Sequence, residues 1–262
     1  MHNVRPPAVA GLFYPADAEE LRTLVNDLLR HAPDTDATPP KAVIAPHAGY
    51  VYSGPIAASA YARLRPLRGQ ITRVVLLGPA HRVAFRGLAA SSADAFRTPL
   101  GDIPLDTKAA AMLARLPQVH TLDDAHALEH SLEVQLPFLQ TVLGRFTLVP
   151  LVVGDAGYTE VAEVLDLLWG GPETLIVISS DLSHYHDYAT AQRMDRATSA
   201  AIEALAPERI DYDDACGRTP VGGLLQAARA RGLRAQTIDL RNSGDTAGPR
   251  NQVVGYGAYA IG

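Results

Sequence analysis

The chain alternates short, continuously apolar runs with longer amphipathic segments, and this order limits its fold more than any other feature. Runs with the length and the Val, Ile and Leu content of strands occupy residues 42–45, 73–77, 146–153, 174–179, 235–240 and 253–261. The first four are apolar at nearly every position, which is typical of strands buried on both faces of a sheet. The last run alternates around Gly255 and Gly257, which favours an antiparallel or edge strand.

Amphipathic segments with helical spacing separate these runs. In the first, leucines and valines form one stripe behind Asp17, Glu19 and Glu20, and acidic residues favour a helix N-terminus. Further helices are predicted at residues 56–64, 107–116, 132–143, 160–168, 189–205 and 221–230. This alternation predicts an α/β fold in which helices flank both faces of a mainly parallel mixed sheet. No repeat or linker interrupts the order, so we expect a single domain over residues 1–262.

Composition narrows the class of protein further. Hydrophobic residues make up 47% of the chain and charged residues 19%, so it can fill a core without a structural metal. The net charge of −5 argues against a nucleic-acid-binding protein, which needs a basic face. The apolar runs are far shorter than the roughly 18 residues of a membrane-spanning helix, so no membrane insertion is expected.

Cysteine usage and the N-terminal residues bear on the compartment. Cys216 is the only cysteine, which excludes an intrachain disulfide and the disulfide-rich secreted class. The first residues show no charged segment followed by a continuous apolar one, so no signal peptide is predicted. A cytoplasmic location is therefore expected.

Histidines follow three of the predicted strands directly. His47 comes after the first run, His81 after the second, and His184, together with Asp181, after the fourth. The carboxyl ends of neighbouring parallel strands meet at one edge of a sheet, which is where ligands bind. A single histidine in such a loop is more often hydrogen-bonded than functional, but three of them predict metal binding or catalysis at this edge.

Cys216 lies just before a predicted helix that has Thr219 as its cap and Pro220 in its first turn. Such a position favours a thiolate, because amide N–H groups and the helix dipole stabilise negative charge. The alternative is a small, buried hydrophobic side chain. Two imidazoles with one thiolate suit a borderline or soft divalent metal, which means zinc, copper or ferrous iron.

A further polar motif, Glu129-His130 followed by Glu133, opens the predicted helix 132–143. His130 and Glu133 are three residues apart and therefore share one helix face. Two interpretations stay open: both side chains point into the cleft, or they satisfy free amides at the helix start. Three further histidines are expected to be solvated: His31, His120 and His126.

Several long motifs resemble those of the Memo family, known in prokaryotes as AmmeMemoRadiSam system protein B. The matching stretches are RPPAVAGLFYPAD, APHAGYVYSG, LLGPAHR, EHSLEVQLPF, ISSDLSHY and GYGAYA. The family is similar to class III extradiol dioxygenases, which are non-haem iron enzymes of α/β fold. The resemblance therefore implies a class III dioxygenase-like fold, and it covers nearly the whole chain.

Carried over residue by residue, the resemblance implies a metal site of His47, His81 and Cys216. Asp181 and His184 would lie beside this site, and the pocket lining would include His130. The dioxygenases complete their two-histidine site with a glutamate, and Cys216 looks like the corresponding position here. A thiolate is softer and more oxidisable than a carboxylate, so a shared fold does not imply the dioxygenase reaction.

Two functions are compatible with this site. The first is a metal-dependent redox enzyme with iron as the expected metal and copper or zinc as alternatives, acting on an unknown small substrate. His184 would then be the general acid/base, because its ordinary pKa of about 6.5 suits proton transfer near neutrality. Asp181 would orient His184, and Tyr50 and Tyr52 would contact the substrate.

The second function is a non-catalytic module, either a metal carrier or a protein whose cleft accepts a peptide or a small anion. In both cases the expected occupant of the cleft is a small molecule or a peptide, with no nucleic acid and no membrane involved. The prokaryotic family name also implies a functional association with radical-SAM and AMMECR-type proteins.

Overall fold

The computed structural model describes residues 3–33 and 38–262. Its helices are α1 (Ala18–His31), α2 (Tyr50–Ala62), α3 (Thr107–Leu113), α4 (Asp124–Ala127), α5 (Leu136–Leu143), α6 (Tyr158–Leu168), α7 (Tyr188–Glu203) and α8 (Arg218–Ala230). Its strands are β1 (Val4–Arg5), β2 (Ala42–Ala45), β3 (Arg73–Pro79), β4 (Leu88–Ala90), β5 (Ala95–Thr98), β6 (Gly101–Pro104), β7 (Val119–Thr121), β8 (Thr147–Val153), β9 (Thr174–Ser179), β10 (His184–His186), β11 (Ala235–Asn242) and β12 (Val253–Ile261).

The main sheet has the strand order β10-β12-β2-β9-β3-β8-β4-β7, with β11 also paired to β12. The central strands β2, β9, β3 and β8 are parallel to one another. At one side β12 is antiparallel to β2, β10 and β11, and at the other β4 is antiparallel to β8. This is the predicted mainly parallel mixed sheet, including the antiparallel strand expected from the glycine-containing run 253–261.

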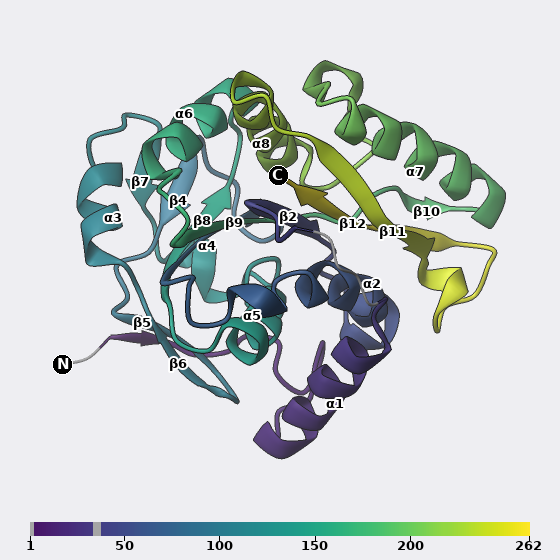
Figure 1. Cartoon of the computed structure of the whole chain (residues 1–262), viewed down its shortest axis with the longest axis horizontal. Helices are drawn as coiled ribbons and strands as arrows, with labels where there is room; N and C mark the ends of the chain where they lie inside the picture. Colours follow the sequence, from purple (N-terminus) through teal and green to yellow (C-terminus); the bar gives the residue numbers. More distant parts are fainter. Residues whose placement is uncertain (1–2, 34–37) are drawn as a thin grey trace.

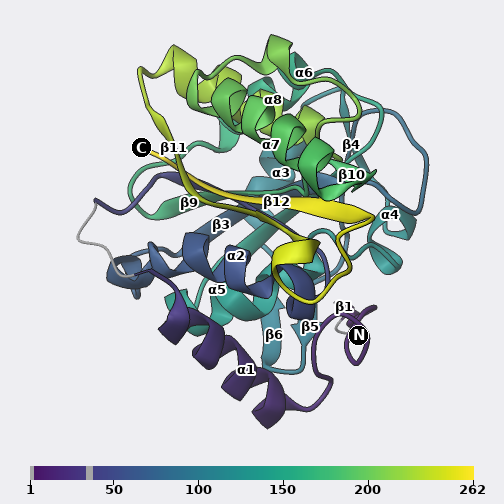
Figure 2. The ribbon, with the colours of Figure 1, turned by 90° about the vertical axis from the view of Figure 1, so that its right-hand side faces the viewer.

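Helices cover both faces of this sheet (Figures 1 and 2). Side chains alternate along each central strand, so in β2 Val43 and Ala45 face one half of the core while Ala42 and Ile44 face the other. Helices α1, α2 and α5 pack on the first half, and α3, α6, α7 and α8 on the second. The predicted α/β fold in one domain is therefore confirmed.

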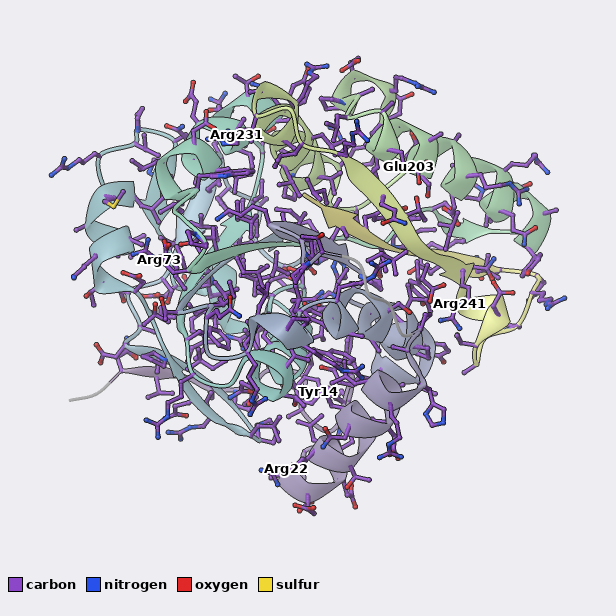
Figure 3. All side chains as sticks on the ribbon, viewed as in Figure 1. Tyr14, Arg22, Arg73, Glu203, Arg231 and Arg241 are labelled. Atoms are coloured by element: carbon purple, nitrogen blue, oxygen red, sulfur yellow. The ribbon has the colours of Figure 1, made fainter. Side chains whose placement is uncertain are left out.

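A second, three-stranded sheet of β1, β5 and β6 lies beside α5. The chain then runs from β1 into the interior before α1 begins. Figure 3 shows Tyr14 on the inner side of α1, whereas Arg22 extends outward from that helix. The N-terminal segment is thus part of the packed core.

Several helix starts differ from the sequence prediction, and two of these differences lie beside the site. Helix α2 was predicted to begin after Pro55 but begins at Tyr50, so the proline lies inside the helix. Helix α8 begins at Arg218 with Gly217 as its cap, so Thr219 and Pro220 lie within its first turn. The sequence analysis also missed strands β1, β4, β5, β6, β7 and β10, which have only two to four residues each. Strands this short depend on their neighbours more than on their own pattern.

Within the described residues, no helix is both long enough and apolar enough to cross a membrane.

Candidate metal centre

Three neighbouring parallel strands bring polar side chains to one edge of the sheet. His47, Asp181 and His81 each lie two residues after the end of their strand, β2, β9 and β3 respectively. The order β2-β9-β3 places these three ends side by side. Cys216 lies in the turn before α8 and reaches the same edge of the sheet. The site thus brings together His47 and Cys216, which are 169 positions apart in the sequence.

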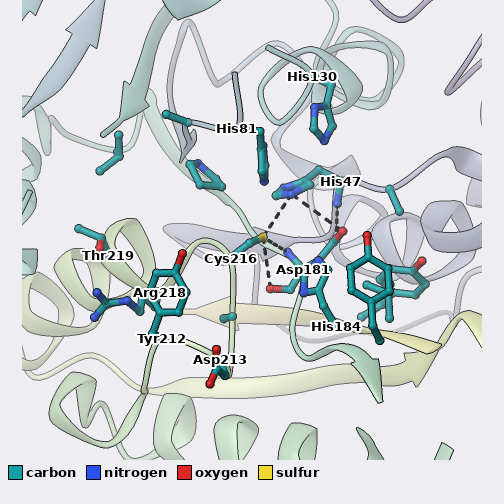
Figure 4. A pocket seen from close by; sticks show the side chains of 18 of the residues that line it. His47, His81, His130, Asp181, His184, Tyr212, Asp213, Cys216, Arg218 and Thr219 are labelled. Atoms are coloured by element: carbon teal, nitrogen blue, oxygen red, sulfur yellow. Dashed lines mark hydrogen bonds and ion pairs between the residues drawn. The ribbon is translucent and has the colours of Figure 1, made fainter. Parts of the chain in front are cut away.

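A pocket of about 1560 Å³ opens at this edge (Figure 4). Of the residues predicted for the site, the structure brings seven to its wall: His47, Tyr52, His81, His130, Asp181, His184 and Cys216. Tyr50 does not line the pocket.

The imidazole of His47 is held in one orientation by hydrogen bonds behind it. The Ser179 hydroxyl donates to the Ser131 carbonyl at 2.6 Å and accepts from the Gln135 amide at 2.8 Å. With its own proton engaged, Ser179 accepts from Nδ1 of His47, 2.8 Å away. The lone pair of His47 is therefore on Nε2, which lies 3.3 Å from Cys216 Sγ. A neutral imidazole oriented through its other nitrogen is the form that binds a metal.

His81 is oriented in the same way by Glu129. Burial alone would raise the pKa of Glu129, but hydrogen bonds and charge from His81 and the Ser131 N–H lower that pKa to about 2. The resulting carboxylate accepts from His81 Nδ1 at 2.9 Å and from the His81 backbone N–H at 2.6 Å. Nε2 of His81 is thus the ring nitrogen left for a metal ion. Glu129 is a candidate functional residue that was quoted within a sequence motif without a role of its own.

The thiol of Cys216 is half-buried beside His47 and Asp181. Burial, and next the Asp181 carboxylate, raises the pKa of Cys216 well above its ordinary value. The start of α8 was expected to favour a thiolate, but burial outweighs the nearby amide groups there and favours the protonated thiol. A divalent cation at Sγ would supply the charge needed to stabilise the thiolate.

The three ligand atoms fit a metal ion in spacing and chemistry. One nitrogen of His47, one nitrogen of His81 and Sγ of Cys216 lie within 4.8 Å of one another. Burial, followed by the neighbouring His81 and His130, lowers the pKa of His47 well below its ordinary value, so this imidazole is neutral near pH 7. Two imidazoles and one thiol form a donor set for a borderline or soft divalent metal.

Comparison with known proteins gives the family. A family model described as "Memo-like protein" matches residues 5–260. The chain belongs to the Memo family. The resemblance inferred from the motifs is thereby confirmed over nearly the whole chain.

Two prokaryotic relatives match over nearly their full length. A MEMO1 family protein of Aquifex aeolicus is 39% identical over 265 residues, covering 97% of each chain. MEMO1 family protein MK0963 of Methanopyrus kandleri is 39% identical over 288 residues, covering 98% of each. Among solved structures, the uncharacterized protein JW3007 from Escherichia coli K12 is similar in fold, with a TM-score of 0.53, 14% identity, and 84% of this chain and 99% of that one covered.

In this Memo-family protein, Asp181 links two of the candidate ligands. Its Oδ1 accepts from the backbone N–H of His47 at 2.7 Å, and its own N–H donates to Cys216 Sγ at 3.3 Å. No hydrogen bond joins the described side chains of Asp181 and His184, although His184 lies in the same pocket. Asp181 contacts His47, and the orientation of His184 by Asp181 stays a prediction.

His130 stacks on His81 at the pocket wall. Their ring centroids lie 4.6 Å apart with planes at 27°, and Phe13 covers His130 at 4.9 Å. Nδ1 of His130 is buried without a hydrogen-bond partner among the described residues and lies 3.4 Å from Glu129 Oε1. A second possible ligand group consists of His81, Glu129 and His130. In this group, however, the Glu129 carboxylate already accepts hydrogen bonds from the backbone N–H groups of His81 and His130.

The two predicted substrate-binding tyrosines point in opposite directions. Because α2 begins at Tyr50, the helical turn of about 100° per residue places Tyr50 and Tyr52 on opposite faces. Tyr50 is buried in the core against Phe138, and its hydroxyl donates to the Val134 carbonyl at 2.6 Å. Tyr52 is 40% exposed and lines the pocket. Of these two tyrosines, only Tyr52 lines the pocket.

Glu133 takes neither of the two roles left open for it. It is fully buried and forms an ion pair with Arg5, and it also accepts from the backbone N–H groups of Ala8 and Val9 and from the Tyr14 hydroxyl. These partners lie 119 to 128 positions away, so Glu133 anchors the N-terminal segment. That segment supplies Leu12 and Phe13 to the pocket.

His126 is buried, which contradicts the expectation that it is solvated. Its Nε2 lies 3.0 Å from the Ala89 carbonyl, and its ring contacts Phe96. Burial lowers the pKa of His126 to about 4, so this imidazole is neutral. It belongs to the core below the site.

Replacing Glu129 by glutamine should weaken divalent-metal binding by about 10–100-fold, as is usual when a partner of a metal-bound histidine is removed. The amide keeps the shape of the side chain but not the charge that holds His81. Zinc competition titration measures the effect. Glu208→Gln, an exposed glutamate paired with Arg229, is the matched control and should bind metal like the wild type. Unchanged affinity in Glu129→Gln would show that Glu129 does not support the site.

Metal affinity should rise by about 10-fold between pH 7 and pH 8, because one proton leaves per metal bound. The raised pKa of Cys216 keeps the metal-free thiol protonated over this range, while His47, with its lowered pKa, has no proton to lose there. Competition titrations at the two pH values, corrected for the chelator's own protonation, test the slope. In the Cys216→Ser variant, metal affinity should no longer rise with pH in this way. Equal affinity of the wild type at both values would mean that no thiol proton is displaced.

Proposed function

We propose that this Memo-family protein binds a divalent metal ion through His47, His81 and Cys216 and acts as a metal-dependent redox enzyme. The observation that supports it is the convergence of two imidazoles and one thiol within 4.8 Å, with both Nδ1 atoms already engaged. Iron is the expected metal and copper the next candidate. Zinc would suit the same donors, but it has no redox chemistry. Bound iron or copper would supply electron transfer and polarise a bound oxygen atom.

The residues around this centre divide the remaining tasks. His184 would accept or donate a proton at its imidazole, since it lies in the pocket without being one of the three clustered ligands. Asp181 would fix the His47 backbone and the Cys216 thiol through its two contacts. Tyr52 and His130 would contact a small molecule or peptide in the pocket. The buried wall behind His47 would exclude water from the metal.

The domain organisation, the cellular location and the family relationships of this protein are also part of the proposal. We propose that residues 1–262 form one Memo-like domain, because both halves of the core pack on a single sheet. A cytoplasmic location would keep the lone thiol of Cys216 reduced and able to bind metal. We propose that this protein resembles class III dioxygenases in its fold and in the position of its metal. The thiol of Cys216 in place of a carboxylate ligand favours a different reaction. A functional association with radical-SAM and AMMECR-type proteins also belongs to this proposal.

Metal analysis of protein purified without added metal tests the proposal, followed by oxygen-consumption assays on the iron- and copper-loaded forms. A redox enzyme should consume oxygen with small reductants faster than the same amount of free metal, and His184→Ala should abolish the difference. Stoichiometric metal without turnover would favour a non-catalytic metal carrier. Absence of metal under all loading conditions would contradict both.

A further inference from the structure

Among the described residues that line the pocket, Arg86 and Arg218 are the only Arg or Lys residues. Neither guanidinium forms an ion pair or hydrogen bond with any described residue. A pocket-lining arginine without a protein partner has all of its N–H donors available to a ligand. Arg86 and Arg218 differ in how well each is placed to bind such a ligand.

Arg218 is closer than Arg86 to Cys216 in the chain, and an aromatic contact restrains its guanidinium group. It follows Cys216 by two residues, so their Cα atoms are at most about 7 Å apart. Its guanidinium carbon lies 5.4 Å from the centroid of the Tyr212 ring, a contact that orients the planar fork of donors. Arg86 has no such ring contact within the described part of the chain. Arg218 therefore loses less freedom when it binds a ligand.

Three aspartates line the pocket, Asp155, Asp181 and Asp213, and none of them forms an ion pair with Arg218. Asp213 lies in the same loop, but its carboxylate is apart from the guanidinium in Figure 4 and forms no ion pair with it. Asp181 is buried and engaged with His47 and Cys216. An anionic group on a ligand is the partner that the Arg218 fork lacks, and a carboxylate matches its two-pronged geometry.

Aromatic side chains provide flat surfaces beside this cation. Tyr52, Tyr185, Tyr212 and Tyr256 all line the pocket. Tyr212 is 78% exposed and Tyr185 69%, so a ligand would remove large apolar surfaces from water. Tyr185 is also one of two non-glycine residues with a positive φ, 63°, within the described residues. Such backbone strain often occurs at ligand-binding positions.

We propose that the pocket takes aromatic carboxylic acids, with Arg218 binding the carboxylate, the tyrosines contacting the ring, and the far end of the molecule at the metal centre. This inference rests on the proposed function for what happens at that far end. The carboxylate contact itself depends only on Arg218 and is testable without metal.

The test compares two probes of equal shape, 2-naphthoate and its neutral amide 2-naphthamide. Isothermal titration measures both against metal-free and zinc-loaded protein, for the wild type, Arg218→Gln and the matched control Arg86→Gln. The wild type should bind naphthoate at least about 10-fold more tightly than naphthamide, because a hydrogen bond to a charged partner contributes that much. Arg218→Gln should reduce the ratio to less than about 2-fold, and Arg86→Gln should leave it unchanged. Arg218→Lys, which keeps the charge and loses the fork, should lie between.

Equal binding of the two probes to the wild type, or no binding of either at millimolar concentration, would overturn the proposal. So would a preference that survives Arg218→Gln, or one that appears only with zinc, since the carboxylate would then bind the metal. Metal content is measured separately on the same samples. A protein that binds no metal but keeps the preference dependent on Arg218 would contradict the proposed function and leave the carboxylate site standing.

Discussion

The His81→Ala variant is expected to bind divalent metal at least about 100-fold more weakly than the wild type, whereas His184→Ala keeps nearly full stoichiometry. Removing a ligand should cost more than the 10–100-fold typical of removing a ligand's supporting partner. His81 is fixed by Glu129 with Nε2 left for the metal, while His184 is not part of the three-residue cluster. Metal analysis after dialysis, with competition titration, measures both variants.

The same pair of variants separates binding from turnover. Any oxygen consumption should disappear in both, but only His184→Ala should lose it while still holding metal. His120→Ala is the control, since His120 is exposed on β7 away from the pocket, and it should behave like the wild type. If His184→Ala loses metal as completely as His81→Ala, then His184 is a ligand and this division of roles is wrong.

Replacing Glu133 by alanine should lower the free energy of unfolding by about 3–5 kcal/mol, the usual cost of leaving one member of a buried ion pair unpaired. Arg5 would keep its charge at a site where it is only 7% exposed. The N–H groups of Ala8 and Val9 and the Tyr14 hydroxyl would lose their acceptor as well. Urea denaturation followed by circular dichroism gives the change in free energy.

The Glu133 variant also links stability to the site. Because the anchored segment carries Phe13, which packs on His130 at 4.9 Å, Glu133→Ala should loosen the pocket wall. Glu208→Ala, at an exposed position, should change stability by less than about 0.5 kcal/mol. Equal stabilities of the two variants would show that the Arg5–Glu133 pair contributes little to the fold.

The parts of the site that follow strands could be predicted from sequence. Continuous apolar runs identified the central strands, and parallel strands end at one edge. His47, His81 and Asp181 therefore met where expected, because each lies two residues beyond its strand. The place of Cys216 came from the family resemblance, since its turn carries no strand signal of its own.

The orientation of individual side chains, and the pairing of residues far apart in the chain, could not be predicted from local sequence patterns. Tyr50 was expected to contact the substrate, ahead of a helix predicted over residues 56–64; the helix begins earlier, at Tyr50, and turns this side chain into the core. Glu129 and Glu133 share one motif, yet one holds His81 and the other holds Arg5, 128 positions away. Nothing in the spacing of that motif distinguishes these partners, because both are supplied by distant parts of the chain.

The most direct test of the metal centre is titration of the metal-free protein with Co²⁺, followed by absorption spectroscopy. Cobalt accepts the same imidazole and thiolate ligands as zinc and iron, and a thiolate ligand produces a charge-transfer band. The account predicts one cobalt per chain, with a band that disappears in Cys216→Ser and weakens in His47→Ala and His81→Ala. A band that survives Cys216→Ser, or saturating cobalt binding without any thiolate band, would contradict a centre built from His47, His81 and Cys216.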